Sequence, residues 1–289
     1  MDVAILGCGY IGQKLAHALR RDGSSVQCFT ASQASADDLT AQGLDVAVCD
    51  LDSNDLSIHL GQTETLYYLA PPPSTGQLDS RSRAAVAAIE GDGLKRVVLI
   101  STTGVYGDCG GDWVDEARPL NPSVDRARRR VDSESVWQAW AHEQNVEISI
   151  LRVAGIYAAD RLPRKRLESG EPVLALDESP FSNRVHADDL VQICMAAARS
   201  KSTGVFNVAD DAPTTMSDYF MRVADALGLV RPIEISRAQA EQRFSDRMMS
   251  YLSESRRIDN GKLKRDLGVT LQYPNLDSGL NAVSKSQCR

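Results

Sequence analysis

The sequence predicts an α/β protein built on a doubly wound parallel sheet. Two observations carry this prediction. Strand-like apolar runs alternate with segments of helix length along much of the chain, and the first run leads directly into a glycine-rich turn. Parallel strands joined through helices form a sheet that is covered on both faces. We expect residues 1–158 and about 185–209 to make up this domain.

The glycine-rich turn has the spacing of a dinucleotide-binding motif. A short apolar strand enters Gly7, Gly9 and Gly12, and apolar residues at helical spacing follow at once. We expect Gly7 to make the tight turn, Gly9 to let a pyrophosphate approach the backbone amides, and Gly12 to let the helix pack on the strand. Tyr10 and Ile11, between these glycines, belong to the same expected site. The motif is typical of the Rossmann fold and predicts NAD or NADP as the cofactor.

Six further strands are expected, at residues 25–30, 45–49, 65–70, 96–101, 147–153 and 205–208. Three prolines at 71–73 follow one of these strands, so they form a loop at the edge where open α/β sheets bind their ligands, although a plain rigid turn fits equally well. After about residue 158 the pattern becomes irregular. We expect a smaller, discontinuous substrate-binding domain there, at about 159–184 and 210–289.

The composition argues against several classes of protein. The 289 residues carry a formal net charge of -7, which disfavours general nucleic-acid binding. The six cysteines form no CxxC pair and have no His–Cys spacing suited to zinc, so we expect reduced thiols and no metal. The first strand starts at the beginning of the sequence and no apolar run has the length of a membrane span. We therefore expect a cytoplasmic protein with no signal peptide and no membrane partner.

Further motifs follow the glycine turn in a fixed order. They are Leu-Ile-Ser-Thr-Thr-Gly-Val-Tyr-Gly at 99–107, Leu-Arg-Val-Ala-Gly-Ile-Tyr at 151–157, Arg-Val-His-Ala-Asp-Asp-Leu at 184–190 and Phe-Asn-Val at 206–208. This order resembles the extended short-chain dehydrogenases/reductases, and most closely the YeeZ-like branch of the NAD(P)-dependent epimerases/dehydratases. The resemblance covers essentially the whole chain. It implies an NAD(P)-dependent protein that acts on a small polar substrate, with sugars as the analogy from the wider family.

In that family a Ser or Thr, a Tyr and a Lys carry out the chemistry. The lysine makes a tyrosinate accessible, which takes a substrate proton while hydride passes to the nicotinamide. The resemblance places Thr102 at the hydroxyl position, with Thr103 beside it as a substrate contact. The alternative is that both hydroxyls satisfy backbone groups of the loop.

Arginines stand where the tyrosine and the lysine are expected. Counting from Glu134, which fits a family glutamate, Arg126 falls at the tyrosine position and Arg130 at the lysine position. A guanidinium stays protonated and has no acceptor, so neither arginine can serve as a base. We expect them to hold an anionic substrate or the nicotinamide ribose. Arg128 and Arg129 are expected to point elsewhere, on a solvated part of the helix.

Three other residues are candidate bases, namely Tyr106, Asp115 and His186. Each has a structural alternative: packing for Tyr106, a loop turn for Asp115, and orientation of the backbone at the domain junction for His186. The resemblance also makes Arg184 a contact to an anionic substrate group, with a surface salt bridge as the alternative. The two aspartates after His186 fit a helix cap better than a metal site.

The sequence leaves the choice between NAD and NADP open. The second strand ends in Phe-Thr-Ala-Ser-Gln, which offers neither an acid to a ribose nor an arginine to a phosphate. We therefore expect Ser32 to serve either cofactor, with weak discrimination. Asp50 corresponds by resemblance to a family aspartate that faces adenine, although a turn explains it nearly as well. Ala70 and Pro71, at the end of a strand, complete the expected cofactor site.

The resemblance also implies a homodimer. In extended members of the family the arginine helix and the preceding helix, here about 78–89, form a four-helix interface. Trp137 and Trp140 on the arginine helix fit such an interface, but tryptophans at helical spacing are more often core residues. Two other functions stay open: a catalytically silent dinucleotide-binding sensor, and a dimeric scaffold with a decayed site.

Overall fold

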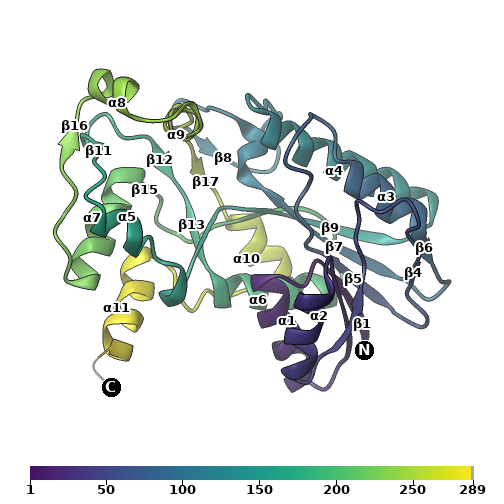
Figure 1. Cartoon of the computed structure of the whole chain (residues 1–289). Coiled ribbons are helices and arrows are strands. Elements are labelled where there is room, and N and C mark those ends of the chain that lie inside the picture. Colours follow the sequence, from purple (N-terminus) through teal and green to yellow (C-terminus); the bar gives the residue numbers. More distant parts are fainter. Residues whose placement is uncertain (288–289) are drawn as a thin grey trace.

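Seven parallel strands form the central sheet of the structure, a computed structural model that describes residues 1–287 (Figure 1). Their order is β3 (Asp45–Val48), β2 (Ser25–Thr30), β1 (Asp2–Leu6), β5 (Thr65–Tyr68), β7 (Arg96–Thr102), β9 (Glu147–Val153) and β14 (Gly204–Val208). Every neighbouring pair is parallel. The strand order reverses at β1, so the sheet is doubly wound and the predicted Rossmann-type fold is confirmed.

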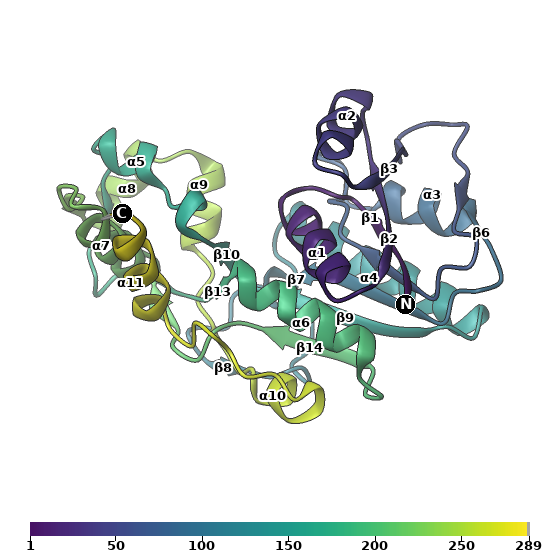
Figure 2. The same ribbon diagram turned by 90° about the horizontal axis from the view of Figure 1, so that it is seen from below.

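Helices cover both faces of this sheet (Figures 1 and 2). Helices α1 (Tyr10–Arg21), α2 (Gln33–Ala41) and α6 (Ala187–Arg199) share one apolar cluster with the strands, and α3 (Ser80–Ala88) and α4 (Asp125–Glu143) share another. On the second face Trp137 is fully buried, with its ring 4.7 Å from that of Tyr68 between centroids. Trp140 is partly buried in the same cluster. Trp137 is therefore a core residue.

A second group of elements lies to one side of the sheet (Figure 1). Helices α5 (Arg164–Glu168), α7 (Met216–Leu227) and α11 (Leu276–Gln287) share an apolar cluster, and α8 (Arg237–Arg243) and α9 (Asp246–Leu252) contribute to another. Short strands pair here as β10 (Gly155–Tyr157) with β13 (Arg184–His186), β11 (Val173–Leu174) with β16 (Glu234–Ile235), β12 (Phe181–Ser182) with β15 (Thr214–Thr215), and β8 (Trp113–Val114) with β17 (Arg257–Ile258). A further short pair, β4 (Ile58–His59) with β6 (Ile89–Glu90), lies on the sheet side instead, where Ile58 is buried in the cluster of α3 and α4.

Helix α10 (Gly261–Leu267) belongs to the sheet layer rather than to this second group. Leu263 and Leu271 are buried in the cluster that α6 and the strands form, and Lys262 Nζ donates to the carbonyl of Val205 at 2.8 Å. These leucines complete the sheet-side core, so this segment packs with the sheet although it follows residue 210. The division into two domains stays a prediction.

Five cysteines are free and buried, namely Cys8, Cys28, Cys49, Cys109 and Cys194, whereas Cys288 lies outside the described residues. Within residues 1–287, no helix combines the length and the apolar character needed to cross a membrane.

The two tryptophans at opposite extremes of exposure give a direct test of this core. Replacing the buried Trp137 by Ala should lower the free energy of unfolding by about 3–5 kcal/mol, because a large cavity is left between α4 and the sheet. Trp113, which is 53% exposed, provides the matched control, and Trp113→Ala should change the same quantity by less than about 1 kcal/mol. Urea unfolding of both variants measures the difference. Equal losses would mean that Trp137 does not anchor α4.

Candidate functional site

The three glycines of the turn have different structural roles. Gly7 has a φ of 96°, and a Cβ added there would lie 2.4 Å from the amide nitrogen of Ala70. A Cβ on Gly12 would lie 3.0 Å from the carbonyl oxygen of Gly7. A Cβ on Gly9 would meet nothing within 4 Å. The fold itself therefore requires glycine at 7 and 12, whereas Gly9 faces open space at the start of α1, where a ligand can approach the backbone.

Helix α1 presents an uncapped N-terminus beside that space. Gly9 is its N-cap, no side chain caps the helix, and its first turn contains no acidic residue. The free amides and the helix dipole both favour an anion there. Ile11 is buried, so only its backbone is available to a ligand. The Tyr10 hydroxyl donates to Asp160 at 2.7 Å, and the Arg161 guanidinium lies 4.5 Å from the centre of the Tyr10 ring.

A pocket of about 150 Å³ adjoins the glycine turn, and we name it the glycine-loop pocket. Its lining residues are Leu6, Gly7, Phe29, Thr30, Ala31, Cys49, Asp50, Leu51, Ala70, Pro71 and Arg81. The predicted residues Asp50, Ala70 and Pro71 therefore lie together. The Asp50 carboxylate also accepts a hydrogen bond from the amide of Asp52 at 3.0 Å, as in the turn that was the alternative for this residue.

Two residues change the expected picture of this pocket. Ser32 does not line it, because its side chain caps α2 and accepts from the amide of Ser35 at 3.4 Å. The cofactor role of Ser32 therefore stays a prediction. Arg81, which the sequence did not single out, does line the pocket. Its guanidinium binds the Asp52 carboxylate at 2.9 and 2.5 Å and donates to the carbonyl of Pro71 at 3.1 Å.

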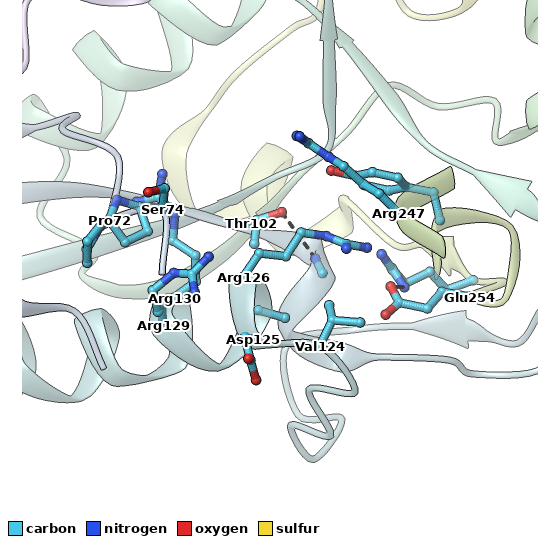
Figure 3. A pocket seen from close by; sticks show the side chains of 15 residues that line it. Pro72, Ser74, Thr102, Val124, Asp125, Arg126, Arg129, Arg130, Arg247 and Glu254 are labelled. Atoms are coloured by element: carbon cyan, nitrogen blue, oxygen red, sulfur yellow. Dashed lines mark hydrogen bonds and ion pairs between the residues drawn. The ribbon is translucent and has the colours of Figure 1, made fainter. Parts of the chain in front are cut away.

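A larger cavity of about 700 Å³ opens at the carboxyl ends of β5 and β7, and we name it the arginine cavity (Figure 3). Its lining residues are Pro72, Pro73, Ser74, Thr102, Gly104, Val124, Asp125, Arg126, Ala127, Arg129, Arg130, Arg247, Tyr251, Glu254 and Arg256. Thr102, Arg126 and Arg130, which the sequence predicted as one site, are thus brought together. The proline loop separates this cavity from the glycine-loop pocket, with Ala70 and Pro71 on one side and Pro72 and Pro73 on the other.

Thr102 ends β7 and caps the short helix η1 (Thr103–Tyr106). Its Oγ1 accepts from the amide of Gly104 at 3.2 Å, so the capping alternative is real, and the hydroxyl can still donate into the cavity. Thr103, by contrast, is 5% exposed and does not line the cavity. Thr103 is thus a buried residue beside the cavity, and its contact with a substrate stays a prediction.

Arg126 connects α4 to α9 across the cavity. Its Nη1 donates to Ser250 Oγ at 2.9 Å, and its guanidinium lies 3.9 Å from the centre of the Tyr251 ring. Figure 3 shows Arg126 extended toward the side of Glu254, while Arg130 lies on the side of Ser74. The two arginines thus serve opposite ends of one cavity.

Arg130 holds the strand ends between the two pockets. Its Nη1 donates to the carbonyl of Ile100 at 2.9 Å and to that of Ala70 at 3.4 Å. Ala70 lines the glycine-loop pocket, so Arg130 lies at the junction with the arginine cavity. Burial of the guanidinium lowers the pKa of Arg130, an effect that the nearby Asp79 opposes. The group nevertheless stays a cation, as arginines do in proteins.

Arg129 differs from its prediction. It is 7% exposed, lines the arginine cavity and donates to the carbonyl of Gly76 in the proline loop, while its buried Nε has no partner. Arg128 does point away and binds Asp125 at 2.7 Å. Positions 126, 129 and 130 follow the i, i+3, i+4 spacing of one helix face, which explains why Arg129 joins the other two.

The cavity carries excess positive charge. Its two acids are already paired, since Glu254 binds Arg256 at 2.9 Å and Asp125 binds Arg128. In the described part of the chain, no carboxylate forms an ion pair with any of the four remaining arginines that line the cavity, which are Arg126, Arg129, Arg130 and Arg247. Cations that line a cavity and have no carboxylate partners attract an anionic ligand.

Tyr106 is part of a buried polar network rather than of the cavity. It is 1% exposed, donates to Asn207 Oδ1 at 2.7 Å and accepts from Arg152 Nη1 at 2.9 Å. Arg152 in turn binds Glu134 at 2.8 Å. Burial raises the pKa of Tyr106, the opposite of what a base near neutral pH requires. The predicted catalytic role of Tyr106 is therefore wrong.

The other predicted side chains also lie outside the arginine cavity. Asp115 is exposed and closes a turn by accepting from the amide of Ala117 at 3.0 Å. His186 Nδ1 accepts from the amide of Asp188 at 3.2 Å, which makes His186 the cap of α6 in place of the aspartates. Burial lowers the pKa of His186 and favours the neutral ring. Arg184 lies under Tyr219, 4.2 Å from its ring centre, and burial lowers the pKa of Arg184.

His186 and Arg184 thus lie on β13 at the junction of the two groups of elements, and their contact with a substrate stays a prediction. The cavity residues that the sequence missed include Arg247, Tyr251, Glu254 and Arg256, from α9 and the segment after it. The sequence around these residues contains no motif. The only signal there is that arginines and an aromatic residue fall close together. No cluster of three or more His, Cys, Asp or Glu side chains that could hold a metal occurs among the described residues.

Comparisons with known proteins agree with this geometry. A sequence model of the NAD dependent epimerase/dehydratase family matches residues 3–209. Protein YeeZ of Escherichia coli (strain K12) is 27% identical over 286 residues, which cover 94% of this chain and 96% of that protein.

Two solved structures extend the comparison. A functionally unknown conserved protein from Silicibacter pomeroyi DSS has a TM-score of 0.84 at 29% identity, over 99% of this chain and 98% of its own. A UDP-glucuronic acid 4-epimerase from Bacillus cereus, in complex with UDP-glucuronic acid and NAD, has a TM-score of 0.74 at 19% identity, over 100% of both chains. At that identity the second likeness shows the fold alone.

The glycine turn allows binding and folding to be separated. Gly9→Ala should weaken NADH binding about tenfold or more, because the methyl group occupies the space in front of α1, while the free energy of unfolding changes by less than about 1 kcal/mol. Gly7→Ala should instead destabilise the fold, through its positive φ and the contact with Ala70. Calorimetric titration and urea unfolding of both variants test this. Unchanged NADH affinity in Gly9→Ala would contradict the assigned site.

Proposed function

The chain belongs to the NAD-dependent epimerase/dehydratase family, and within it we propose an NAD(P)-dependent enzyme that acts on a small polar substrate with an anionic group. The observation that carries this proposal is the arginine cavity, which opens beside the glycine-loop pocket and contains four arginines without carboxylate partners. Sugar-type substrates remain the analogy from the wider family, and fold analogy alone does not identify a reaction.

The residues around the glycine turn fit a dinucleotide. Gly9 leaves open space before the uncapped start of α1, which suits a pyrophosphate, and Asp50 and Arg81 line the neighbouring pocket for the adenosine half. When bound, the nicotinamide would exchange a hydride with the substrate. Thr102 would hold the reacting substrate oxygen by a hydrogen bond from its hydroxyl, and Arg126 would bind the anionic group.

We propose that the protein discriminates weakly between NAD and NADP. The strand end that normally selects the cofactor contributes only Thr30 and Ala31 to the pocket, neither of them charged. Arg81 is the cation available to a ribose phosphate, and Asp52 already neutralises it at 2.5 Å. Neither cofactor therefore gains a strong electrostatic advantage.

A catalytically silent sensor that binds the dinucleotide is the second candidate. One observation favours it, because none of the predicted bases Tyr106, Asp115 and His186 lines the arginine cavity. The arginines at 126 and 130 cannot take a proton in place of the family tyrosine. A dimeric scaffold without cofactor is the third candidate, and we regard the cytoplasm as the site of action in all three cases.

Titration with NADH and NADPH separates these candidates. We expect micromolar binding of both, with affinities within about a hundredfold of each other, and turnover with small anionic carbonyl compounds. Arg126→Ala should reduce kcat/KM for such a compound by about a hundredfold, through loss of a charge-assisted hydrogen bond. Binding without turnover across a broad panel would favour the sensor. Failure to bind either cofactor would contradict the enzyme and leave the scaffold.

We also propose a homodimer that forms through α3 and α4. Both helices keep exposed positions away from the sheet, among them Arg83, Ala87, Gln138 and Ala139. The described core does not need a partner to bury Trp137, so the dimer should fold as two complete protomers. Small-angle scattering should give twice the mass of one chain, and Ala139→Arg should shift it toward one chain by placing charge at the contact. A monomeric parent would overturn the proposal.

A further inference from the structure

The arginines without carboxylate partners do not all lie at the end of the cavity beside α9. Arg130 lies deep, bound to the carbonyls of Ile100 and Ala70, where β5 and β7 end. Ala70 lines the glycine-loop pocket and Thr102 lines the arginine cavity, so any ligand that spans both pockets passes Arg130. Arg126 extends along the same cavity from one helical turn earlier (Figure 3). Arg130 thus lies nearest the proposed position of the nicotinamide, and Arg126 adds a second cation toward the α9 end of the same cavity.

Nearby acids do not cancel this charge by direct contact. Burial lowers the pKa of Arg130, and Asp79 and Glu134 are the nearby carboxylates that partly oppose this effect. The Asp79 carboxylate accepts from the amide and the hydroxyl of Ser82, at 3.1 and 2.7 Å. Glu134 is bound to Arg152 at 2.8 Å. Both carboxylates therefore have other partners, and the guanidinium of Arg130 interacts mainly with two backbone dipoles.

The two oxidation states of the cofactor differ in charge at one place. The oxidised nicotinamide ring carries a positive charge and the reduced ring carries none, whereas the phosphates are the same in both. Fixed cations near that ring repel only the oxidised form, and the repulsion is strong where little water screens it. The arrangement implied by the family has one permanent cation, a lysine, beside a neutral tyrosine. Here both positions are permanent cations.

We infer that Arg126 and Arg130 make this protein bind the reduced dinucleotide more tightly than the oxidised one. The inference rests on the proposed function, because it requires the nicotinamide in the arginine cavity. With this preference, the free protein is prepared for reduction of an anionic substrate by NADH. It is less suited to a reaction that begins when NAD oxidises the substrate. An anionic substrate then offsets the positive charge of the arginine cavity.

The test compares the affinities of NADH and NAD for the full-length protein in the absence of substrate. Calorimetric titration should show NADH binding about tenfold or more tightly than NAD. Arg126→Gln and Arg130→Gln should each reduce this ratio severalfold, because each removes one cation. Arg130→Lys keeps the charge and should preserve the ratio within about twofold. Urea unfolding of each variant checks that it is folded.

Arg128→Gln is the matched control, since Arg128 lies on the same helix, binds Asp125 and does not line the cavity. It should leave the ratio unchanged. Should Arg130→Gln fail to fold, Arg126→Gln still decides the question, because Arg126 reaches across the cavity from the surface of α4.

The possible results separate this inference from the function on which it rests. Equal affinities of the parent for NADH and NAD, or a ratio that Arg126→Gln leaves unchanged, would overturn the inference while keeping the protein as a dinucleotide binder. Absence of binding by NADH, NAD, NADPH and NADP would overturn both. A strong preference for NADH that falls in both glutamine variants but not in Arg128→Gln would establish the inference.

Discussion

The buried ion pair between Glu134 and Arg152 sets the geometry on which the candidate site depends. The two side chains are 3% and 7% exposed, and Ser101 on β7 also donates to Glu134. This network fixes α4 against β7 and β9, so the face that carries Glu134 cannot rotate. Arg126 and Arg130 lie on that face, two turns and one turn earlier. Removing one member of such a pair leaves an uncompensated buried charge, a loss of about 3–5 kcal/mol, which makes the orientation of α4 a stable property of the fold.

Under the proposed function, Arg126 and Arg130 take the place of the family tyrosine and lysine on this face. A tyrosine–lysine pair moves protons, whereas two guanidiniums hold charge and donate hydrogen bonds. Arg130 uses part of its donor capacity on the carbonyls of Ala70 and Ile100, which ties the cofactor side of the cavity to the substrate side. Arg126 instead contacts α9 through Ser250 and Tyr251. Under the proposed function, the site therefore acts on its ligand mainly through the electrostatic field of these arginines.

Much of this could be read from the sequence because it depends on local patterns. The strands at 25–30 and 147–153 were predicted to the residue, and the three glycines were predicted in their separate roles, since turn geometry and helix packing follow from short spacings. Thr102 was found through the motif around it. The burial of a single side chain could not be predicted from the sequence, so Tyr106, which is a core residue, was taken for a candidate base. Tyr251 and Arg247 line the cavity only because of tertiary packing. They lie more than a hundred residues after α4 in the sequence, so no sequence spacing predicts their place in the site.

The arginines of the cavity come from two parts of the chain that are far apart in the sequence, so its positive charge depends on how these parts pack together. Arg126, Arg129 and Arg130 come from α4, while Arg247 and Arg256 come from α9 and the segment after it. The contacts that hold α9 and the segment after it in place include the stack of Arg126 on Tyr251, the hydrogen bond of Ser123 to Glu254 at 2.6 Å, and that of Arg256 to the carbonyl of Gly107 at 2.6 Å. The first of these uses a guanidinium that also lines the cavity. One side chain thus both bridges α4 to α9 and contributes to the charge of the cavity, so the position of α9 and the position of that charge depend on the same interaction.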